Sequence, residues 1–195
     1  MFRTLIFIMS TCCFTAQANT ISENTLDAGK VFAQGKPITL LGKGVAVGDK
    51  APNFKVVNDD FAPITLDDYQ GQAILISSVA SLDTGICSLQ TKHFNDKIAQ
   101  DFPGIIMLTI SADLPFAQKR FCNTESINTV VTLSDSVWKD FGEKYGLIIK
   151  DMGLLTRAIF ILDSNHNIIY KQIVKNISTE PDYTSVTDKL NTLQN

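Results

Sequence analysis

The sequence is poor in the residues that mark several familiar protein classes. Its 195 residues include only 4 cysteines, 6 prolines, 11 glycines and 2 histidines. Four cysteines are too few for a disulfide-rich scaffold, and so little glycine and proline excludes a collagen-like chain. The formal net charge of -3 provides no basic surface for nucleic acid. Hydrophobic residues, by contrast, make up 45% of the chain, which excludes intrinsic disorder and suffices for one packed domain.

The first eighteen residues have the layout of a secretory signal peptide. Arg3 supplies a positive start, residues 5–14 an apolar stretch, and residues 16–18 (Ala-Gln-Ala) a small-residue cleavage site. An apolar stretch of about ten residues is too short for a membrane-spanning helix, which needs roughly 20. A buried N-terminal helix would normally carry polar residues on one face. We therefore predict cleavage after Ala18, export of the protein, and no stable membrane anchor.

Removal of this leader would leave two cysteines. Cys12 and Cys13 lie within the leader, and their surroundings fit a lipid-anchor motif poorly. Cys87 and Cys122 remain, in a compartment where disulfides form. A purely structural disulfide between them would close a loop of about 35 residues and stabilise the fold by about 4 kcal/mol. This alternative stays open until the surroundings of both cysteines are considered.

Hydrophobic patterning predicts one α/β domain over residues 31–195, preceded by a flexible lead-in at 19–30. Apolar runs with the length of buried strands alternate with helical segments, which implies a sheet covered by helices on both faces. A hairpin near the end of the chain makes this sheet mixed. The expected strands lie at 54–57, 73–79, 105–110 and 130–133, with an N-terminal hairpin at 31–41 that turns at Gly35-Lys36 and hairpin strands at 158–162 and 168–174. A helical turn is expected at 65–69. Helices are expected at 87–102, from an N-cap at Asp113 to about Cys122, at 136–145, and from Pro181 onward.

The helix at 87–102 and the two histidines bear on the type of chemistry. His93 lies on this helix and His166 in a turn expected to be solvated, and neither has the spacing of a metal ligand. We expect no metal and no cofactor. The absence of a C-x-x-C motif excludes the usual disulfide-exchange site. The apolar side of the helix is expected to consist of Ile86, Leu89, Phe94, Ile98 and Phe102.

Cys87 follows a strand and falls in the first turn of the predicted helix, after an N-cap at Asp83 or Thr84. Free amide groups and the positive end of the helix dipole favour a thiolate there. A thiolate that persists at neutral pH needs roughly 3.4 kcal/mol of stabilisation, whereas a helix end supplies about 0.3–1 kcal/mol. A second positive group, an Arg or a Lys, is therefore required, and spacing alone does not identify it. Taken alone, such a cysteine is more often a core residue.

Two segments carry a resemblance to a known family. Residues 81–87 read SLDTGIC, and residues 111–122 read SADLPFAQKRFC. Together with Thr-Arg-Ala at 156–158 and TEPDY at 179–183, they closely resemble the thiol peroxidase family, an atypical two-cysteine branch of the peroxiredoxins. The resemblance extends from about residue 35 to residue 193 and implies a thioredoxin-like fold.

The resemblance assigns roles to individual residues. It implies that Cys87 is the peroxidatic cysteine and Cys122 the resolving one, and that the two form an intrachain disulfide. It implies that Thr84 hydrogen-bonds the thiolate and the peroxide, and that Arg157 is the second positive group. One motif position departs from the family, because Ala80 stands where peroxiredoxins usually have a proline that shields the reactive sulfur.

The same resemblance implies an activity and partners. The substrates would be hydrogen peroxide and alkyl or lipid hydroperoxides, the reductant a thioredoxin-like dithiol protein, and the assembly a homodimer. Disulfide formation requires Cα atoms within about 7 Å. Because the two cysteines lie at the start of one predicted helix and the end of another, we expect one or both helices to unwind locally.

Two other functions remain as alternatives. The chain could be an exported thioredoxin-fold binding protein with a structural disulfide, or a general dithiol oxidant of protein thiols. Consumption of hydroperoxide with a dithiol donor distinguishes the peroxidase from both. The leader predicts a location in the bacterial periplasm, and a leader without function would leave the protein in the cytoplasm.

Overall fold

The computed structural model describes residues 20–194. The predicted leader at 1–18, with Cys12 and Cys13, lies outside these residues. In the part of the chain that is described, none of the helices combines the length and the apolar character needed to span a membrane.

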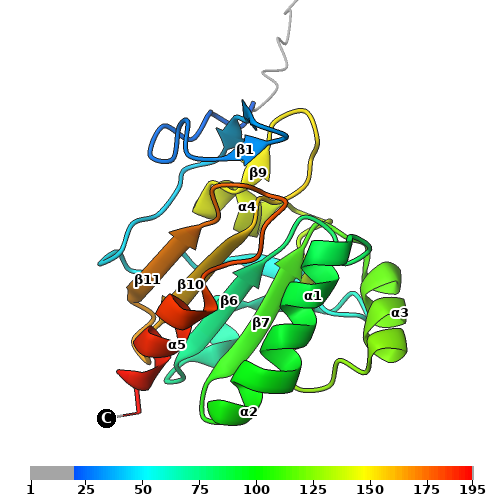
Figure 1. The fold of residues 1–195 in the computed structure, drawn as a ribbon, viewed down its shortest axis with the longest axis vertical. Helices are drawn as coiled ribbons and strands as arrows, with labels where there is room; N and C mark the ends of the chain where they lie inside the picture. Colours follow the sequence, from blue (N-terminus) through cyan, green and yellow to red (C-terminus); the bar gives the residue numbers. More distant parts are fainter. Residues whose placement is uncertain (1–19, 195) are drawn as a thin grey trace, which may run out of the picture.

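A seven-stranded mixed sheet forms the centre of the molecule, in the order β11-β10-β6-β7-β8-β4-β5. Figure 1 shows β11, β10, β6 and β7 side by side. Strands β6, β7 and β8 are parallel, and the flanking pairs are antiparallel, so the predicted mixed sheet is confirmed. The strands are β4 (Lys55–Val57), β5 (Pro63–Thr65), β6 (Ile74–Ser78), β7 (Ile106–Ser111), β8 (Val131–Ser134), β10 (Ala158–Leu162) and β11 (Ile168–Ile173).

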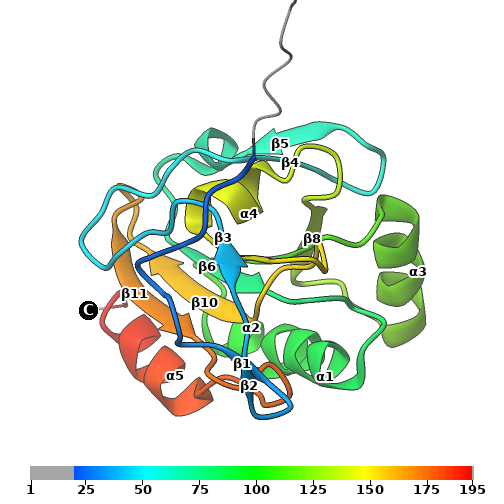
Figure 2. The same cartoon turned by 90° about the horizontal axis from the view of Figure 1, so that it is seen from above.

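Helices cover both faces of this sheet, as predicted. The helices are α1 (Gly85–His93), α2 (Ala99–Asp101), α3 (Pro115–Glu125), α4 (Asp140–Tyr145) and α5 (Tyr183–Asn191). Figure 2 shows α1 and α5 on one side of the strands and α4 on the other. The side chains of β6 alternate between the two faces, as a strand requires. Ile74 and Ile76 pack into the core under α4, while Leu75 packs into the core under α1 and α5.

The predicted N-terminal hairpin is present, but its turn lies one residue earlier than expected. β1 (Phe32–Ala33) pairs with β2 (Lys36–Pro37), so Gln34 and Gly35 form the turn, both with positive φ. A two-residue hairpin loop with positive φ at both positions matches the right-handed twist of the strands. Two further short strands, β3 (Leu40–Leu41) and β9 (Ile148–Ile149), pair with each other.

The polar segment ahead of this hairpin, predicted as a flexible lead-in, is mostly exposed but contributes two buried side chains. Asn24 and Asp27 are buried. The carboxylate of Asp27 accepts hydrogen bonds of 2.8 and 2.9 Å from Lys171 on β11. Burial alone would raise the pKa of Asp27, but hydrogen bonds from Lys171 and Asn24 and the charge of Lys171 outweigh it and hold this pKa below its ordinary value.

The long helix predicted at 87–102 is divided by a π-helical turn, η2 (Phe94–Ile98). The predicted burial of Leu89 is wrong, because this side chain is 51% exposed and the buried side of α1 instead carries Cys87, Gln90 and Thr91. Gln90 and Thr91 are polar but buried, because their side chains form hydrogen bonds in the interior. Hydrophobicity alone therefore did not indicate the buried face of α1.

The η2 turn places the buried side-chain amide of Asn95 against the segment that follows α3. The side-chain oxygen of Asn95 accepts hydrogen bonds from three successive backbone amides, those of Asn128 at 3.0 Å, Thr129 at 2.9 Å and Val130 at 3.3 Å. Asn95 is itself buried. Asn95 therefore links the segment just before β8 to the helical region that begins with α1, the helix of Cys87.

Three further expectations are corrected. The helix predicted from Ser136 begins at Asp140, because the buried Asp135 accepts from the amides of Phe141 and Gly142 and the chain turns with positive φ at Lys139. The edge strand β5 lies where no strand was expected, between the strand predicted at 54–57 and the helical turn predicted at 65–69. His166 is not solvated: it is only 5% exposed, and its Nε2 lies 3.1 Å from the carbonyl oxygen of Tyr69.

Candidate functional site

Cys87 lies at the start of α1, directly after the central strand β6. Thr84 is the N-cap residue, with extended backbone angles (φ -101, ψ 142), so Cys87 is the third residue of the helix. The first-turn amides of a helix lack intrahelical partners and form its positive end. Cys87 is completely buried and carries a free thiol. The predicted position of this cysteine in the first helical turn is confirmed.

Arg157 brings a positive charge to this sulfur from the neighbouring strand. It precedes β10, which pairs with β6 so that Ala158 lies opposite Ser78. The Nη2 atom of Arg157 lies 3.3 Å from Sγ of Cys87. The guanidinium is buried. A buried cation is stable only with compensating partners, so an anion at this sulfur would be favoured.

The other partners of Arg157 are neutral. Nη1 donates to Oε1 of Gln90, and Nη2 also donates to the carbonyl oxygen of Ile177 at 3.1 Å. Nε is buried and has no hydrogen-bond partner among the described residues. None of the ion pairs within residues 20–194 involves Arg157. No carboxylate among the described residues neutralises this guanidinium, so its positive charge acts on the Cys87 sulfur that it contacts.

Gln90 is a residue of the site that the sequence analysis missed. It lies one helical turn after Cys87 and is buried. Its Nε2 donates to Oγ of Ser77 at 2.7 Å while its Oε1 accepts from Arg157. The available signal was a polar residue three positions after the cysteine, which places both side chains on one face of the helix.

Thr84, the N-cap residue of α1, is exposed. Its hydroxyl donates to the carbonyl oxygen of Ser81 at 2.9 Å, rather than to the sulfur of Cys87. Thr84 lines a cavity of about 400 Å³ between the start of α1 and α3, together with Gly85 and Arg120. The structure therefore joins Cys87 to Arg157 directly, and places Thr84 beside an open cavity.

Cys122 lies on the last turns of α3 and has a different set of partners. Its sulfur lies 3.3 Å from Oγ1 of Thr132 on β8, and its thiol is free. Burial raises the pKa of the Cys122 thiol above its ordinary value, and the hydrogen bond with Thr132 offsets part of that rise. The side chain packs against the same core cluster as Cys87 but lines a second cavity of about 400 Å³, beside Ile64 and Tyr69.

Two predicted features of α3 are corrected. The helix does not stop near Cys122 but continues to Glu125, and Ser126 ends it in a left-handed conformation. Asp113 is not the N-cap residue, which is Leu114. The carboxylate of Asp113 accepts instead from the backbone amide of Leu82, in the loop before Cys87.

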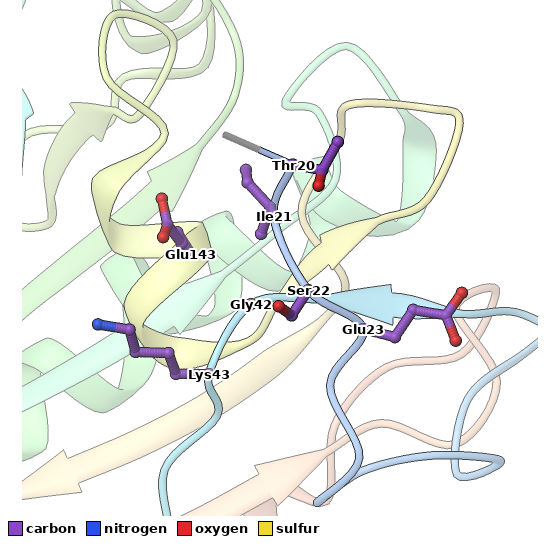
Figure 3. Close-up of a pocket in the computed structure, with 7 residues that line it drawn as sticks. All are labelled: Thr20, Ile21, Ser22, Glu23, Gly42, Lys43 and Glu143. Carbon is purple, nitrogen blue, oxygen red and sulfur yellow. The ribbon is translucent and has the colours of Figure 1, made fainter. Parts of the chain in front are cut away.

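A larger cavity, of about 540 Å³, lies away from both cysteines, between the N-terminal segment and α4 (Figure 3). Its lining combines Lys43 with Glu23 and Glu143, and contains no cysteine or histidine. Within the described part of the chain, no three or more His, Cys, Asp or Glu side chains form a group that could hold a metal ion.

Known proteins are similar to this chain over most of its length. A family model described as Redoxin matches residues 46–187. The thiol peroxidase of Halalkalibacterium halodurans is 47% identical over 150 residues, which cover 77% of this chain and 90% of that protein. The thiol peroxidase of Oceanobacillus iheyensis is 48% identical over 155 residues, covering 80% and 94%.

Solved structures show the same fold. A peroxiredoxin-like protein from Aquifex aeolicus superposes with a TM-score of 0.79 and 39% identity, covering 85% of this chain and 98% of that one. A thiol peroxidase from Chromobacterium violaceum, with a TM-score of 0.76 and 20% identity over 83% of this chain and 95% of its own, shares the fold. The predicted α/β fold class is thereby confirmed.

Proposed function

The chain belongs to the Redoxin family and to its thiol peroxidases, and we propose that it reduces hydrogen peroxide and alkyl or lipid hydroperoxides at Cys87. Enzymes of this kind contribute to antioxidant defence. The observation that carries the proposal is the 3.3 Å contact between Nη2 of Arg157 and the Cys87 sulfur at the start of α1. Both groups favour the thiolate, which is the form of cysteine that attacks a peroxide.

In the first step, the Cys87 thiolate attacks one oxygen of the hydroperoxide. The O–O bond breaks, the leaving oxygen takes a proton and departs as water or an alcohol, and Cys87 becomes a sulfenic acid. Charge develops on the leaving oxygen during this step. The unpaired Nε–H of Arg157 and the free amides of the first turn of α1 are the donors that would stabilise it. Thr84 would turn its hydroxyl from Ser81 toward the peroxide.

In the second step, the Cys122 thiol attacks the sulfenic sulfur of Cys87. Water leaves, and an intrachain disulfide forms. Cys122 contacts Thr132 in the described thiol form, so its sulfur must leave that partner first. Because Cys122 lies on the last turns of α3, opening of this helix end from Cys122 to Ser126 would free it.

In the third step, a dithiol donor reduces this disulfide. We propose a thioredoxin-like protein, which would transfer two electrons by thiol–disulfide exchange and become oxidised itself. The relatives that match are bacterial proteins. With the predicted leader at 1–18, this donor would be exported and the enzyme periplasmic. A leader without function would place both in the cytoplasm.

We propose further that the enzyme is a homodimer. Leu114 and Phe116, at the start of α3, are 58% and 67% exposed. The Phe116 ring lies 5.2 Å from the ring of Phe61, which is also exposed. Exposed apolar patches of this kind are typical of protein interfaces. Sedimentation of the wild type and of Phe116→Asp tests this: a dimer that the substitution dissociates supports the assembly, and a wild-type monomer contradicts it.

The intact mass of the exported protein, before and after one equivalent of hydroperoxide, tests the catalytic cycle. Loss of the mass of two hydrogens indicates the Cys87–Cys122 disulfide, and the starting mass reports whether the leader is removed. Turnover is then measured with a dithiol donor. A binding protein or a general dithiol oxidant would not consume hydroperoxide, so an unchanged peroxide concentration overturns the proposal.

A further inference from the structure

The loop between β6 and α1 determines where the reactive sulfur lies. This loop, residues 79–84, contains Ala80 at the position where peroxiredoxins usually have a proline. A proline ring fixes φ, whereas alanine leaves this torsion free. The chain must therefore hold the loop in some other way.

Two hydrogen bonds fasten the loop to β7 and the segment that follows it. At its start, the amide of Val79 donates to the carbonyl oxygen of Ile110 at 3.1 Å. In its middle, the amide of Leu82 donates to Oδ2 of Asp113 at 2.7 Å. The second bond is the shorter one and ends on a carboxylate, which makes it a charge-assisted hydrogen bond. It lies two residues before Thr84, the N-cap of the helix that carries Cys87.

Asp113 is itself held in place on several sides. Its Oδ2 also accepts from Oγ of Ser111 at 2.8 Å, and its carbonyl oxygen accepts from Oγ of Ser134 at 2.6 Å. Ser111 in turn accepts from Nε2 of Gln118 at 2.9 Å, a buried side chain on α3. A carboxylate with a second hydrogen-bond partner, on a backbone that is itself fastened, can hold a loop accurately.

We propose that Asp113 is a positioning residue for the peroxidase reaction, whose carboxylate holds the Leu82 amide and thereby sets the place of the Cys87 sulfur against Arg157. This inference rests on the proposed function. Asp113 also lies two residues before α3, so its carboxylate links the segment that carries Cys87 to the one that carries Cys122.

The proposal predicts different results for two substitutions at this position. Asp113→Ala frees the Leu82 amide, and small displacements of a reacting group cost up to about a hundredfold in rate. We expect the rate constant for oxidation of Cys87 to fall by about tenfold or more. In Asp113→Asn the amide oxygen can accept the same two hydrogen bonds, so we expect a rate within about threefold of the wild type.

Single-turnover oxidation of Cys87 by hydrogen peroxide, followed in the full chain by peptide mass spectrometry, measures these rates. Alkylation of Cys87 by iodoacetamide is measured in parallel, because it needs the thiolate but not the geometry that peroxide requires. Asp163→Ala is the matched control. The Asp163 carboxylate also accepts from backbone amides, those of Asn165 at 2.9 Å and Asn167 at 2.8 Å, in a turn on another part of the fold.

A slow peroxide reaction in Asp113→Ala, with alkylation changed less than the peroxide rate and with Asp113→Asn and Asp163→Ala near the wild type, supports the positioning role. Wild-type rates in Asp113→Ala overturn it. A parallel fall of both reactions, or an Asp113→Asn variant as slow as Asp113→Ala, also overturns it. If wild-type Cys87 does not react with peroxide at all, the proposed function fails, which separates that outcome from a failure of the positioning role.

Discussion

Gln90 and Arg157 hold each other in place beside the sulfur of Cys87. The amide oxygen of Gln90 accepts from Nη1 of Arg157, and the amide nitrogen of Gln90 donates to Ser77 at 2.7 Å. Arg157 is thus fixed from α1, the helix that carries Cys87, and from the carbonyl oxygen of Ile177 in the segment after β11. A guanidinium fixed in this way is organised before the substrate arrives, which is the condition for strong electrostatic catalysis.

The first prediction concerns Arg157. Arg157→Met should lower the rate of Cys87 oxidation by about 10²–10³-fold, the loss typical for a donor that stabilises developing charge. Arg157→Lys should recover only part of this loss, because an ammonium group cannot contact Gln90, Cys87 and Ile177 at once. Stopped-flow oxidation with excess hydroperoxide measures both. A Met variant as fast as the wild type would exclude Arg157 from catalysis.

The second prediction separates the two cysteines. Cys87→Ser should abolish peroxide consumption, since the hydroxyl that replaces the thiol is a far weaker nucleophile. Cys122→Ser should complete one rapid round and then stop at the sulfenic acid, because no resolving thiol is present. Mass spectrometry after trapping of the sulfenic acid shows the difference. Equal loss of the first round in both variants would contradict the assigned roles.

The third prediction concerns the opening of α3. Lys92 on α1 and Glu125 on the last turn of α3 form an ion pair of 2.7 Å. This ion pair holds the end of α3, the helix that carries Cys122, against α1. Lys92→Met should speed disulfide formation after the sulfenic acid by about twofold, since exposed ion pairs make small contributions. Quenched-flow mass spectrometry measures this step.

The matched control for that measurement is Lys150→Met. Lys150 forms an equally short ion pair of 2.7 Å with Glu23, remote from α3. This substitution should leave disulfide formation unchanged. Equal rates in wild type, Lys92→Met and Lys150→Met would show that this helix end does not limit the resolving step.

The fourth prediction concerns acid stability. The hydrogen bonds from Lys171 and Asn24 hold the pKa of Asp27 below its ordinary value despite its burial. A carboxyl group with a lowered folded-state pKa adds stability above its unfolded pKa of about 3.9, and this stability is lost as the pH falls through the folded value. Asp27→Asn should therefore cost about 2 kcal/mol of unfolding free energy at pH 7 and progressively less below pH 4.

Urea unfolding of both proteins across this pH range measures the effect. Glu23→Gln is the control, because Glu23 is an exposed partner of Lys150 on the same segment and should leave the unfolding free energy unchanged. A constant difference between wild type and Asp27→Asn at all pH values would show that the charge of Asp27 is not responsible.

The regular parts of the fold could be predicted from the sequence because they follow simple periodicities. The apolar run at 73–79 contains β6, and the helix predicted from Pro181 corresponds to α5, which buries Val186 and Leu190. The elements that were missed depend on tertiary contacts. β5 is a short edge strand that exists only through pairing with β4, and the late start of α4 depends on the buried carboxylate of Asp135.

The site shows the same division. The position of Cys87 at the start of a helix follows from local sequence, and so does the need for a positive group in addition to the helix end. Local sequence does not identify that group, because Arg157 is 70 positions away and reaches the sulfur only through the pairing of β10 with β6. Gln90 was missed because a polar residue on the buried side of a helix looks, in the sequence, like a residue on its solvated side.

The three amides held by Asn95 set a boundary for the catalytic cycle. If the end of α3 opens so that Cys122 can reach Cys87, the melted stretch must stop before residue 128, where this single side chain keeps the backbone in place. Strand β8 then keeps its alignment with β7 during every round of oxidation and reduction. In the proposed cycle, exchange of the Cys122–Thr132 contact for the disulfide would then leave the central sheet as it is.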